Sequence, residues 1–202
     1  MKFGLILFLV LFAIGSFVFL FGPIIKIKLG LIFHKRLTAK TLYKYAKDFD
    51  VFLINNVSLP INDKAIEFDH ILFGEKFIYC IKDCSYKVGI EGSAGDLKWF
   101  SYNKKGDMEY IENPFQKNNL NLSMLRKYMN LTNEDKFFYS IVSINDGCET
   151  KIEKCGDNEV ITTRKDLYKI IRAKEKDSSV KKINQERLEK TVKLLYERIE
   201  KK

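Results

Sequence analysis

The chain has 202 residues and a formal net charge of +9. Apart from an apolar N-terminal segment, this length is enough for one hydrophobic core. The positive charge lies at the two ends: residues 26–47 carry seven Lys or Arg and no acid, whereas residues 48–163 carry 13 basic and 19 acidic residues. This distribution excludes a central domain with the overall basic surface that nucleic-acid-binding domains usually have.

An uncharged, apolar segment opens the chain. Phe3 to Ile25 contains no charged residue, and as a helix it extends about 34 Å, enough to cross the apolar core of a bilayer. We therefore expect a transmembrane anchor over residues 1–25. A cleaved signal peptide is the alternative. Against it, Lys2 is the only basic residue before the apolar run, and no small-x-small cleavage motif precedes the basic segment.

The basic segment, residues 26–47, has two interpretations. It either binds anionic lipid headgroups, at about 1 kcal/mol per basic residue, or it only sets the topology and forms a solvated helix face. In both cases its charge predicts a cell-membrane protein with a single-pass helix and its C-terminal domain in the cytoplasm. A first helix is expected from Leu37 to Asp48, with Leu42 and Tyr45 facing inward.

Residues 48–202 are expected to form one α/β domain. A strand at Val51–Ile54 is expected to end at Asn55-Asn56. Three short strands follow between Glu67 and Trp99, of which the apolar run Phe77–Ile81 is typical of a strand buried on both faces.

The second half of this domain continues with alternating helices and strands. Asn113-Pro114 has the pattern of a helix start. Lys136–Ile144 predicts a strand and Val160-Ile161 a short edge strand, and Thr163 or Asp166 opens the next helix. An apolar stripe at helical spacing closes the chain and is read as core packing, with Ile183, Leu188, Val192, Leu195 and Ile199 as its members.

Five pieces of the sequence resemble the nuclease-related domain (NERD) family, whose fold is like that of restriction endonucleases. They are Glu67-Phe68-Asp69-His70, the strand Phe77–Ile81, Ile90-Glu91-Gly92, Trp99 and Asn113-Pro114-Phe115-Gln116. The resemblance extends from about Phe33 to the C-terminus. It implies a mixed central sheet flanked by helices, here behind one N-terminal transmembrane helix.

The sequence departs from the family pattern at the residues that carry the chemistry. Where the family has Glu-x-Lys, this chain has Lys82-Asp83-Cys84, and the Gly-Glu pair of the family's first helix is missing between Arg36 and Lys47. In restriction-like nucleases the Asp and Glu hold the metal and the Lys stabilises charge on the attacked phosphate. The resemblance therefore implies a degenerate site.

The resemblance implies a vestigial catalytic site at Asp69, Gln116 and Lys82, and any metal would be held by Asp69 and Glu67. We expect Lys82 to form a salt bridge with Asp69 in place of a cation. Asp83 points to the other face of a regular strand, so that it can replace the missing Glu only if a bulge re-aims it.

The two histidines have separate interpretations. His70 is either a general base, since its pKa can lie near neutrality, or a structural hydrogen-bonding group. His34 is expected at the membrane interface.

The four cysteines do not have the spacing of a zinc site. In the cytoplasm Cys80, Cys84, Cys148 and Cys155 are expected to stay reduced, and a Cys148–Cys155 disulfide becomes feasible only if the topology is reversed. The sequence has no Gly-rich phosphate loop, no Ser-His-Asp order and no dinucleotide fingerprint.

Three functions remain open. The preferred one is a membrane-anchored NERD protein that acts as a catalytically degenerate binding or scaffolding module, without a cofactor. The first alternative is an active metal-dependent nuclease that uses Mg²⁺ or Mn²⁺ and rebuilds its site from Asp69, Asp83 or Glu91, Gln116 and a displaced Lys. The second is a membrane-surface module that does not bind nucleic acid. Anionic lipids and nucleic acid are the candidate partners, and no protein partner is indicated.

Overall fold

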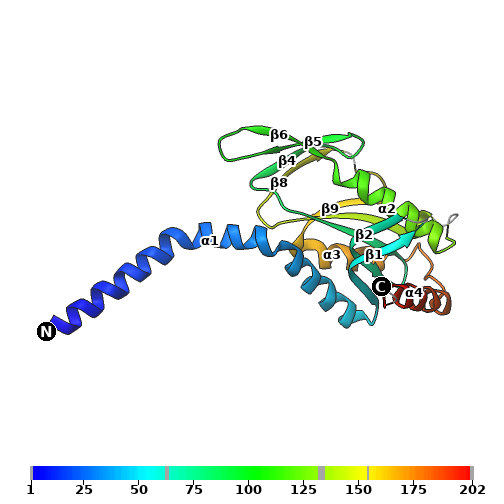
Figure 1. Cartoon of the computed structure of the whole chain (residues 1–202), viewed down its shortest axis with the longest axis horizontal. Helices are drawn as coiled ribbons and strands as arrows, with labels where there is room; N and C mark the ends of the chain where they lie inside the picture. Colours follow the sequence, from blue (N-terminus) through cyan, green and yellow to red (C-terminus); the bar gives the residue numbers. More distant parts are fainter. Residues whose placement is uncertain (1, 62–63, 132–134, 154, 201–202) are drawn as a thin grey trace. The chain divides into compact units, whose positions relative to one another are not determined.

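The computed structural model describes residues 2–61, 64–131, 135–153 and 155–200. The chain divides into two compact units, residues 1–33 and residues 34–202. The second unit contains all the strands, which form two sheets flanked by helices (Figure 1). The expected mixed α/β class is therefore confirmed, although two sheets stand where one was expected.

The first helix, α1, runs without a break from Lys2 to Phe49. Among the described residues, no helix has both the length and the apolar character needed to cross a membrane. The transmembrane helix expected over residues 1–25 is therefore a wrong prediction. It treated the uncharged run as a helix of its own, whereas α1 continues through the basic segment and ends on the sheet, where Leu42 and Tyr45 are buried as expected.

The larger sheet has five strands in the order β1-β2-β3-β7-β9. β1 and β2 are antiparallel, as are β2 and β3, whereas β7 runs parallel to both β3 and β9. Strand β7, which lies between β3 and β9, is buried along its whole length. The strand bounds are Phe52–Ile61 (β1), Lys64–Phe73 (β2), Ile78–Cys84 (β3), Phe138–Ile144 (β7) and Glu159–Thr163 (β9).

Helices cover both faces of this sheet. On one face, buried residues of β1, β2, β3 and β7 pack with α2 (Pro114–Tyr128) and α4 (Gln185–Glu200). On the other face, the end of α1 and α3 (Arg164–Glu175) pack against Leu72, Tyr79 and Ile141. The apolar stripe expected in the final segment does enter the core, with Ile183, Leu188, Val192 and Leu195 buried; the side chain of Ile199 lies outside the described residues.

The end of β1 was misplaced by the sequence interpretation, because the strand continues past Asn55-Asn56 to Ile61. The residues of β1 that face the core have even numbers before this point, as Ile54 does, and odd numbers after it, namely Val57, Leu59 and Ile61. Asn56 has φ 49°, a left-handed conformation that Asn tolerates better than most residues. The strand therefore twists here without breaking its pairing with β2, and the twist lies opposite Asp69 and His70.

The second sheet has four strands in the order β6-β5-β4-β8. Two antiparallel connections join β4, β5 and β6, and β8 pairs with β4 in parallel. A short 3₁₀ turn, η1 (Asp135–Phe137), precedes β7. The strand bounds are Gly89–Ser93 (β4), Lys98–Tyr102 (β5), Met108–Glu112 (β6) and Glu149–Glu153 (β8).

The inner face of the second sheet packs around Trp99, which is fully buried and meets Phe115 of α2 edge-on. The indole N–H donates to the carbonyl of Ser93 at 2.7 Å. Asn113 caps α2 by accepting from the N–H of Phe115 at 2.9 Å, which confirms the expected helix start. Its side-chain amide also donates to the carbonyls of Ala94 and Asp96, so this one residue joins the helix to the sheet.

We predict that Gly92→Ala destabilises the protein by about 1–3 kcal/mol, the usual cost of overpacking a filled core. A Cβ at Gly92 would collide with the Trp99 ring. Gly95→Ala is the matched control, since a Cβ there meets nothing within 4 Å. Urea unfolding of both variants measures the difference, and equal stability of the two would contradict the packing described.

Candidate functional site

Asp69 and Lys82 face each other across the antiparallel pair of β2 and β3. The register pairs His70 with Ile81. Because the strands are antiparallel, Asp69 on β2 lies opposite Lys82 on β3. The ammonium of Lys82 lies 2.8 Å from Oδ2 of Asp69. The salt bridge expected between these two residues is therefore present.

A second ammonium group, that of Lys35 on α1, binds the same carboxylate. Its Nζ lies 2.6 Å from Oδ1 of Asp69, and the backbone N–H of Asp83 donates to Oδ2 at 3.2 Å. Both oxygens of Asp69 are thus occupied by positively charged donors. Sequence reasoning missed Lys35, because the contact joins residues 34 positions apart and the basic run around it offers no sign of which lysine turns inward.

These contacts shift the pKa values of both partners. Burial alone would raise the pKa of Asp69, but the hydrogen bonds from Lys35 and Lys82 outweigh it and hold the pKa below its usual range. Burial alone would lower the pKa of Lys82, but its hydrogen bond to Asp69 outweighs it and raises the pKa. The aspartate therefore stays ionised and the lysine charged through the neutral range.

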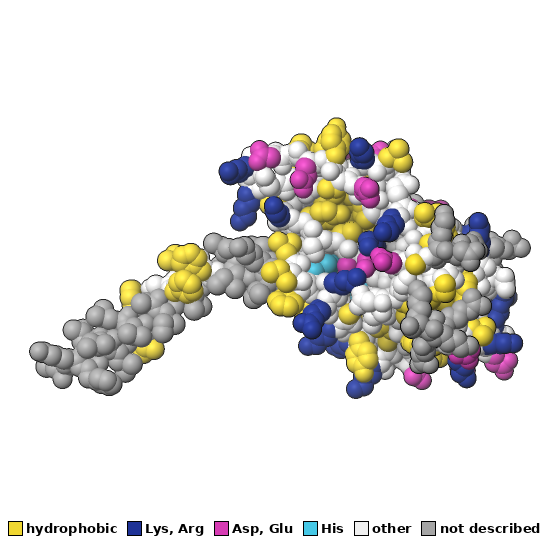
Figure 2. Space-filling view, viewed as in Figure 1, with side chains coloured by type: hydrophobic (Ala, Val, Ile, Leu, Met, Phe, Trp, Pro, Cys, Tyr) yellow, Lys and Arg dark blue, Asp and Glu magenta, His cyan; other side chains and the backbone are white. Residues whose placement is uncertain are grey.

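A buried polar network lies beside this cluster, with Asp83 between two histidines. Oδ2 of Asp83 lies 2.6 Å from Nε2 of His70, and Oδ1 lies 3.5 Å from Nε2 of His34. The exposed fractions of these side chains are 5% for Asp83, 0% for His70 and 3% for His34. Figure 2 shows a histidine next to acidic and basic side chains on the face drawn.

The two imidazoles extend the network to three further elements. Nε2 of His34 donates to the carbonyl of Ser143 on β7 at 3.0 Å, and Nδ1 of His70 lies 2.6 Å from the side-chain amide of Asn55 on β1. The expected interfacial position of His34 is therefore wrong, since its ring is buried in the folded domain. The hydrogen-bonding interpretation of His70 agrees with these contacts.

Asp83 therefore stays apart from the carboxylate of Asp69. Its side chain turns to the histidines, as the alternation of a regular strand predicts, and only its backbone N–H reaches Asp69. Glu91, the other acid considered for a rebuilt site, is an exposed residue of β4 in the second sheet.

Gln116 and Glu67 do not join the cluster through any described contact. Gln116 is exposed in the first turn of α2, and Glu67 is exposed on β2, where its backbone carbonyl accepts from the amide of Asn121 at 2.8 Å. The buried polar residues of α2 are instead Asn118 and Asn121. The side chain of Asn118 binds Cys80 and Ser140. The proposed roles of Gln116 and Glu67 stay predictions.

Cys84 is the residue that the sequence comparison with the family pattern aligned with a charge-stabilising lysine, an assignment that stays a prediction. Burial raises the pKa of its thiol to about 11, so that the group is neutral at physiological pH. It lies on β3 with Cys80, and all four cysteines are free. A neutral thiol supplies no positive charge to a phosphate.

The donor set around Asp69 does not fit a divalent cation. A cation needs carboxylate oxygens that are free to coordinate it, and here each oxygen already accepts from an ammonium group. Within the described ranges, no group of three or more His, Cys, Asp or Glu side chains is arranged to hold a metal ion.

Comparison with known families finds a match over more than half of the chain. The family model described as nuclease-related domain matches residues 32–145, which include α1 from Ile32 onward and end after β7. Proteins with curated descriptions and solved structures yield no match. The matched range contains Lys35, Asp69, Lys82 and Asp83.

We predict that Lys35 and Lys82 stabilise the fold jointly through Asp69. Lys35→Met or Lys82→Met alone is expected to cost about 1 kcal/mol, because one ammonium remains, whereas the double variant strands the carboxylate and costs about 3 kcal/mol. Lys40→Met, an exposed position on the same helix, is the control. Urea unfolding of the four variants gives the coupling, and strictly additive single effects would contradict it.

The same interaction should depend on pH in a defined direction. Because the pKa of Asp69 is lowered, its stabilisation is complete above the usual carboxyl range and is lost as the pH falls through the folded-state pKa. Because the pKa of Lys82 is raised, its share is complete below the usual lysine pKa and is lost as the pH rises through the folded-state pKa. The difference between parent and double variant should therefore be level from about pH 5 to about pH 9 and shrink in acid.

Proposed function

Because the chain belongs to the nuclease-related domain family, we propose that it keeps the nuclease fold as a binding module and does not itself hydrolyse phosphodiester bonds. The observation that carries this proposal is the position of two ammonium groups, those of Lys35 and Lys82, on the two oxygens of Asp69. In a cation-dependent nuclease of this fold, these oxygens would face the metal.

Metal-assisted hydrolysis requires two things of such a site. It needs acids that hold the cation, and a donor for the charge that develops on the attacked phosphate. Asp69 is the one acid in place, since the carboxylate of Asp83 is held by His70. The neutral thiol of Cys84 stands where the donor belongs. The site therefore lacks a second acid to hold the cation and a positively charged donor for the attacked phosphate.

Electrostatics also opposes a cation here. A divalent ion near the Asp69 carboxylate would lie within a few ångströms of two ammonium groups, and such like-charge contacts cost several kcal/mol at intermediate dielectric. The cluster of Asp69, Lys35 and Lys82 carries one surplus positive charge, and half of the Lys35 side chain is exposed. An anion such as a phosphate group is the ligand that this charge would attract.

The first test is direct. The full-length protein should show no cleavage of single- or double-stranded DNA with Mg²⁺ or Mn²⁺. Asp69→Ala serves as the control, because a contaminating nuclease would be unaffected by it. Cleavage by the parent that disappears in Asp69→Ala would replace this proposal by the rebuilt nuclease.

A second prediction restores the family pattern. Lys82→Glu places a carboxylate opposite Asp69, Cys84→Lys adds an ammonium on the same strand face, and Lys35→Ala frees Oδ1 of Asp69. We expect this triple variant to be stabilised by millimolar Mn²⁺, seen as a rise in melting temperature, because a ligand that binds the folded state raises its stability. The parent should show no such rise.

The matched control carries Gln in place of Glu at position 82, with the other two changes kept. Gln has the same shape without the charge, so it separates cation binding by the carboxylate pair from a general salt effect. An equal Mn²⁺ response of both triple variants, or of the parent, would contradict the placement of Lys82 in the family's metal position.

A further inference from the structure

The second sheet ends in an open edge. In the described part of the chain β6 pairs with β5 alone, and four of its five residues are exposed. The N–H of Asn103 donates to the carbonyl of Asp107, and that of Asn113 donates to the carbonyl of Leu97. Both bonds belong to the register that pairs Phe100 with Tyr110.

These two bonds fix which backbone groups of β6 are free. In an antiparallel ladder, hydrogen-bonded and non-hydrogen-bonded pairs alternate. The bonded pairs are therefore those of Glu109 and Ile111 with β5, and the backbone N–H and C=O groups of Met108, Tyr110 and Glu112 point away from the sheet. A row of unpaired groups of this kind is a template for another strand.

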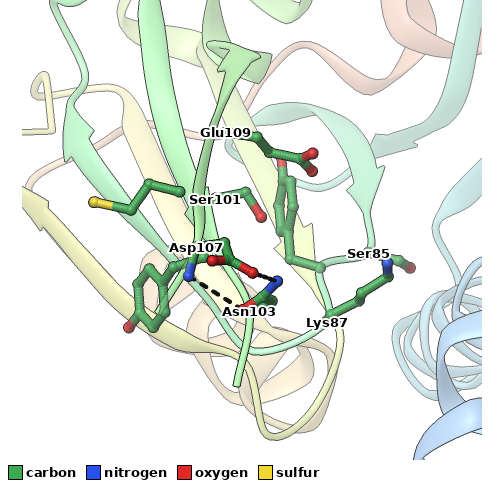
Figure 3. Close-up of a pocket in the computed structure, with 9 residues that line it drawn as sticks. Ser85, Lys87, Ser101, Asn103, Asp107 and Glu109 are labelled. Carbon is green, nitrogen blue, oxygen red and sulfur yellow. Dashed lines mark hydrogen bonds between the residues drawn. The ribbon is translucent and has the colours of Figure 1, made fainter. Parts of the chain in front are cut away.

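A polar pocket of about 310 Å³ adjoins the start of this edge. Asp107, Met108 and Glu109 line it from β6 and its turn, and Lys87 is the basic residue in its wall. In Figure 3, Glu109 and Lys87 lie at opposite ends of the group, and Asp107 is held by Asn103. The carboxylate of Glu109 has no ion-pair or hydrogen-bond partner among the described residues.

The outer face beside the edge carries aromatic rings that already bind ammonium groups. Tyr110 is 69% exposed and packs against Phe100, with ring centroids 4.6 Å apart. Lys98 lies over the ring of Tyr110, and Lys151 lies over that of Tyr102. The strand itself contributes acids at positions 109 and 112 and no basic residue.

We propose that β6 binds an extended basic peptide, which adds to the second sheet as a fifth strand. The outward backbone groups of Met108, Tyr110 and Glu112 would pair with it, which is the usual mode of strand addition. A lysine or arginine opposite Glu109 would point to the same sheet face as Glu109, where the pocket lies. Residues on the other face would meet Tyr110 and Glu112.

The charges favour this occupant over three others. A second copy that paired through its own β6 would bring Glu109 and Glu112 close to the same acids. Nucleic acid and anionic lipid would be repelled by the carboxylates of this edge. A peptide that alternates basic and apolar residues would place a basic side chain opposite Glu109 and an apolar one opposite the ring of Tyr110.

The probe is a fluorescent ten-residue peptide of alternating lysine and valine, and the matched peptide has glutamate in place of lysine. Anisotropy with the full-length protein should show at least about tenfold tighter binding of the lysine peptide. Hydrogen exchange should slow on binding at the amides of Met108, Tyr110 and Glu112. The amides of Glu109 and Ile111 already pair with β5 and should change little.

Tyr110→Pro removes the central outward N–H, and proline is tolerated in an edge strand at such a position. It should weaken lysine-peptide binding by about tenfold relative to Tyr110→Thr, which loses the ring but keeps the N–H. Glu109→Gln should weaken binding of the lysine peptide, because it removes the carboxylate charge and leaves the backbone pairing of β6 unchanged.

Four results would overturn the proposal. The first two are that the lysine peptide does not bind, or that both peptides bind equally. The third is that Tyr110→Pro and Tyr110→Thr, both folded by circular dichroism, bind the lysine peptide with equal affinity. The fourth is that the parent forms a dimer which Tyr110→Pro dissociates. None of these readouts depends on nuclease activity, so the result stands apart from the function proposed for Asp69.

Discussion

The buried carboxylate of Asp83 lies where α1 first meets the larger sheet, at His34. A carboxylate removed from water is costly unless it is paired. Here Oδ2 lies 2.6 Å from Nε2 of His70, whereas Oδ1, 3.5 Å from Nε2 of His34, has no hydrogen-bond partner among the described residues. These rings lie on α1 and β2, and they reach onward to Ser143 on β7 and Asn55 on β1. The network around the Asp83 carboxylate thus links α1 to four strands, which are β1, β2, β7 and β3, the strand of Asp83 itself.

The position of α1 in turn decides the chemistry at Asp69. With His34 buried against the sheet, the next residue, Lys35, lies over β2 and reaches Oδ1 of Asp69. The helix in which the family resemblance implies an acid supplies an ammonium group here, that of Lys35. Together with Lys82 it neutralises a carboxylate that is 12% exposed. A largely buried acid is stabilised in this way without a metal ion, and the same contacts leave no oxygen of Asp69 free for one.

Local patterns predicted those features that depend on neighbouring residues. The apolar run of β3, the Asn-Pro start of α2 and the Thr163 cap of α3 follow from residue preferences within one element. The Asp69–Lys82 pair was predicted from the family resemblance, which places Lys82 where a metal-ligating Glu is expected beside Asp69, and the two side chains do form a salt bridge. His34 and Lys35 were not recognised, since their partners lie 34 to 109 positions away and a basic helix gives no sign of its buried face. The second sheet was missed because its strands have only five residues each.

The pieces of the family pattern that this chain retains are largely architectural. Gly92 admits the ring of Trp99, the indole binds the turn after β4, and Asn113 both caps α2 and holds the loop before β5. His70 belongs to the buried network and not to an exposed site. Gly92, Trp99 and Asn113 fix the second sheet to α2, and His70 links β2 to Asp83 on β3. None of these contacts requires a cation. By the family resemblance, positions 82 and 84 are those of a metal ligand and of the charge-stabilising lysine, and in this chain a lysine and a thiol stand there. The family match over residues 32–145 thus includes residues such as Trp99 and Asn113, whose contacts here are those of core packing and helix capping.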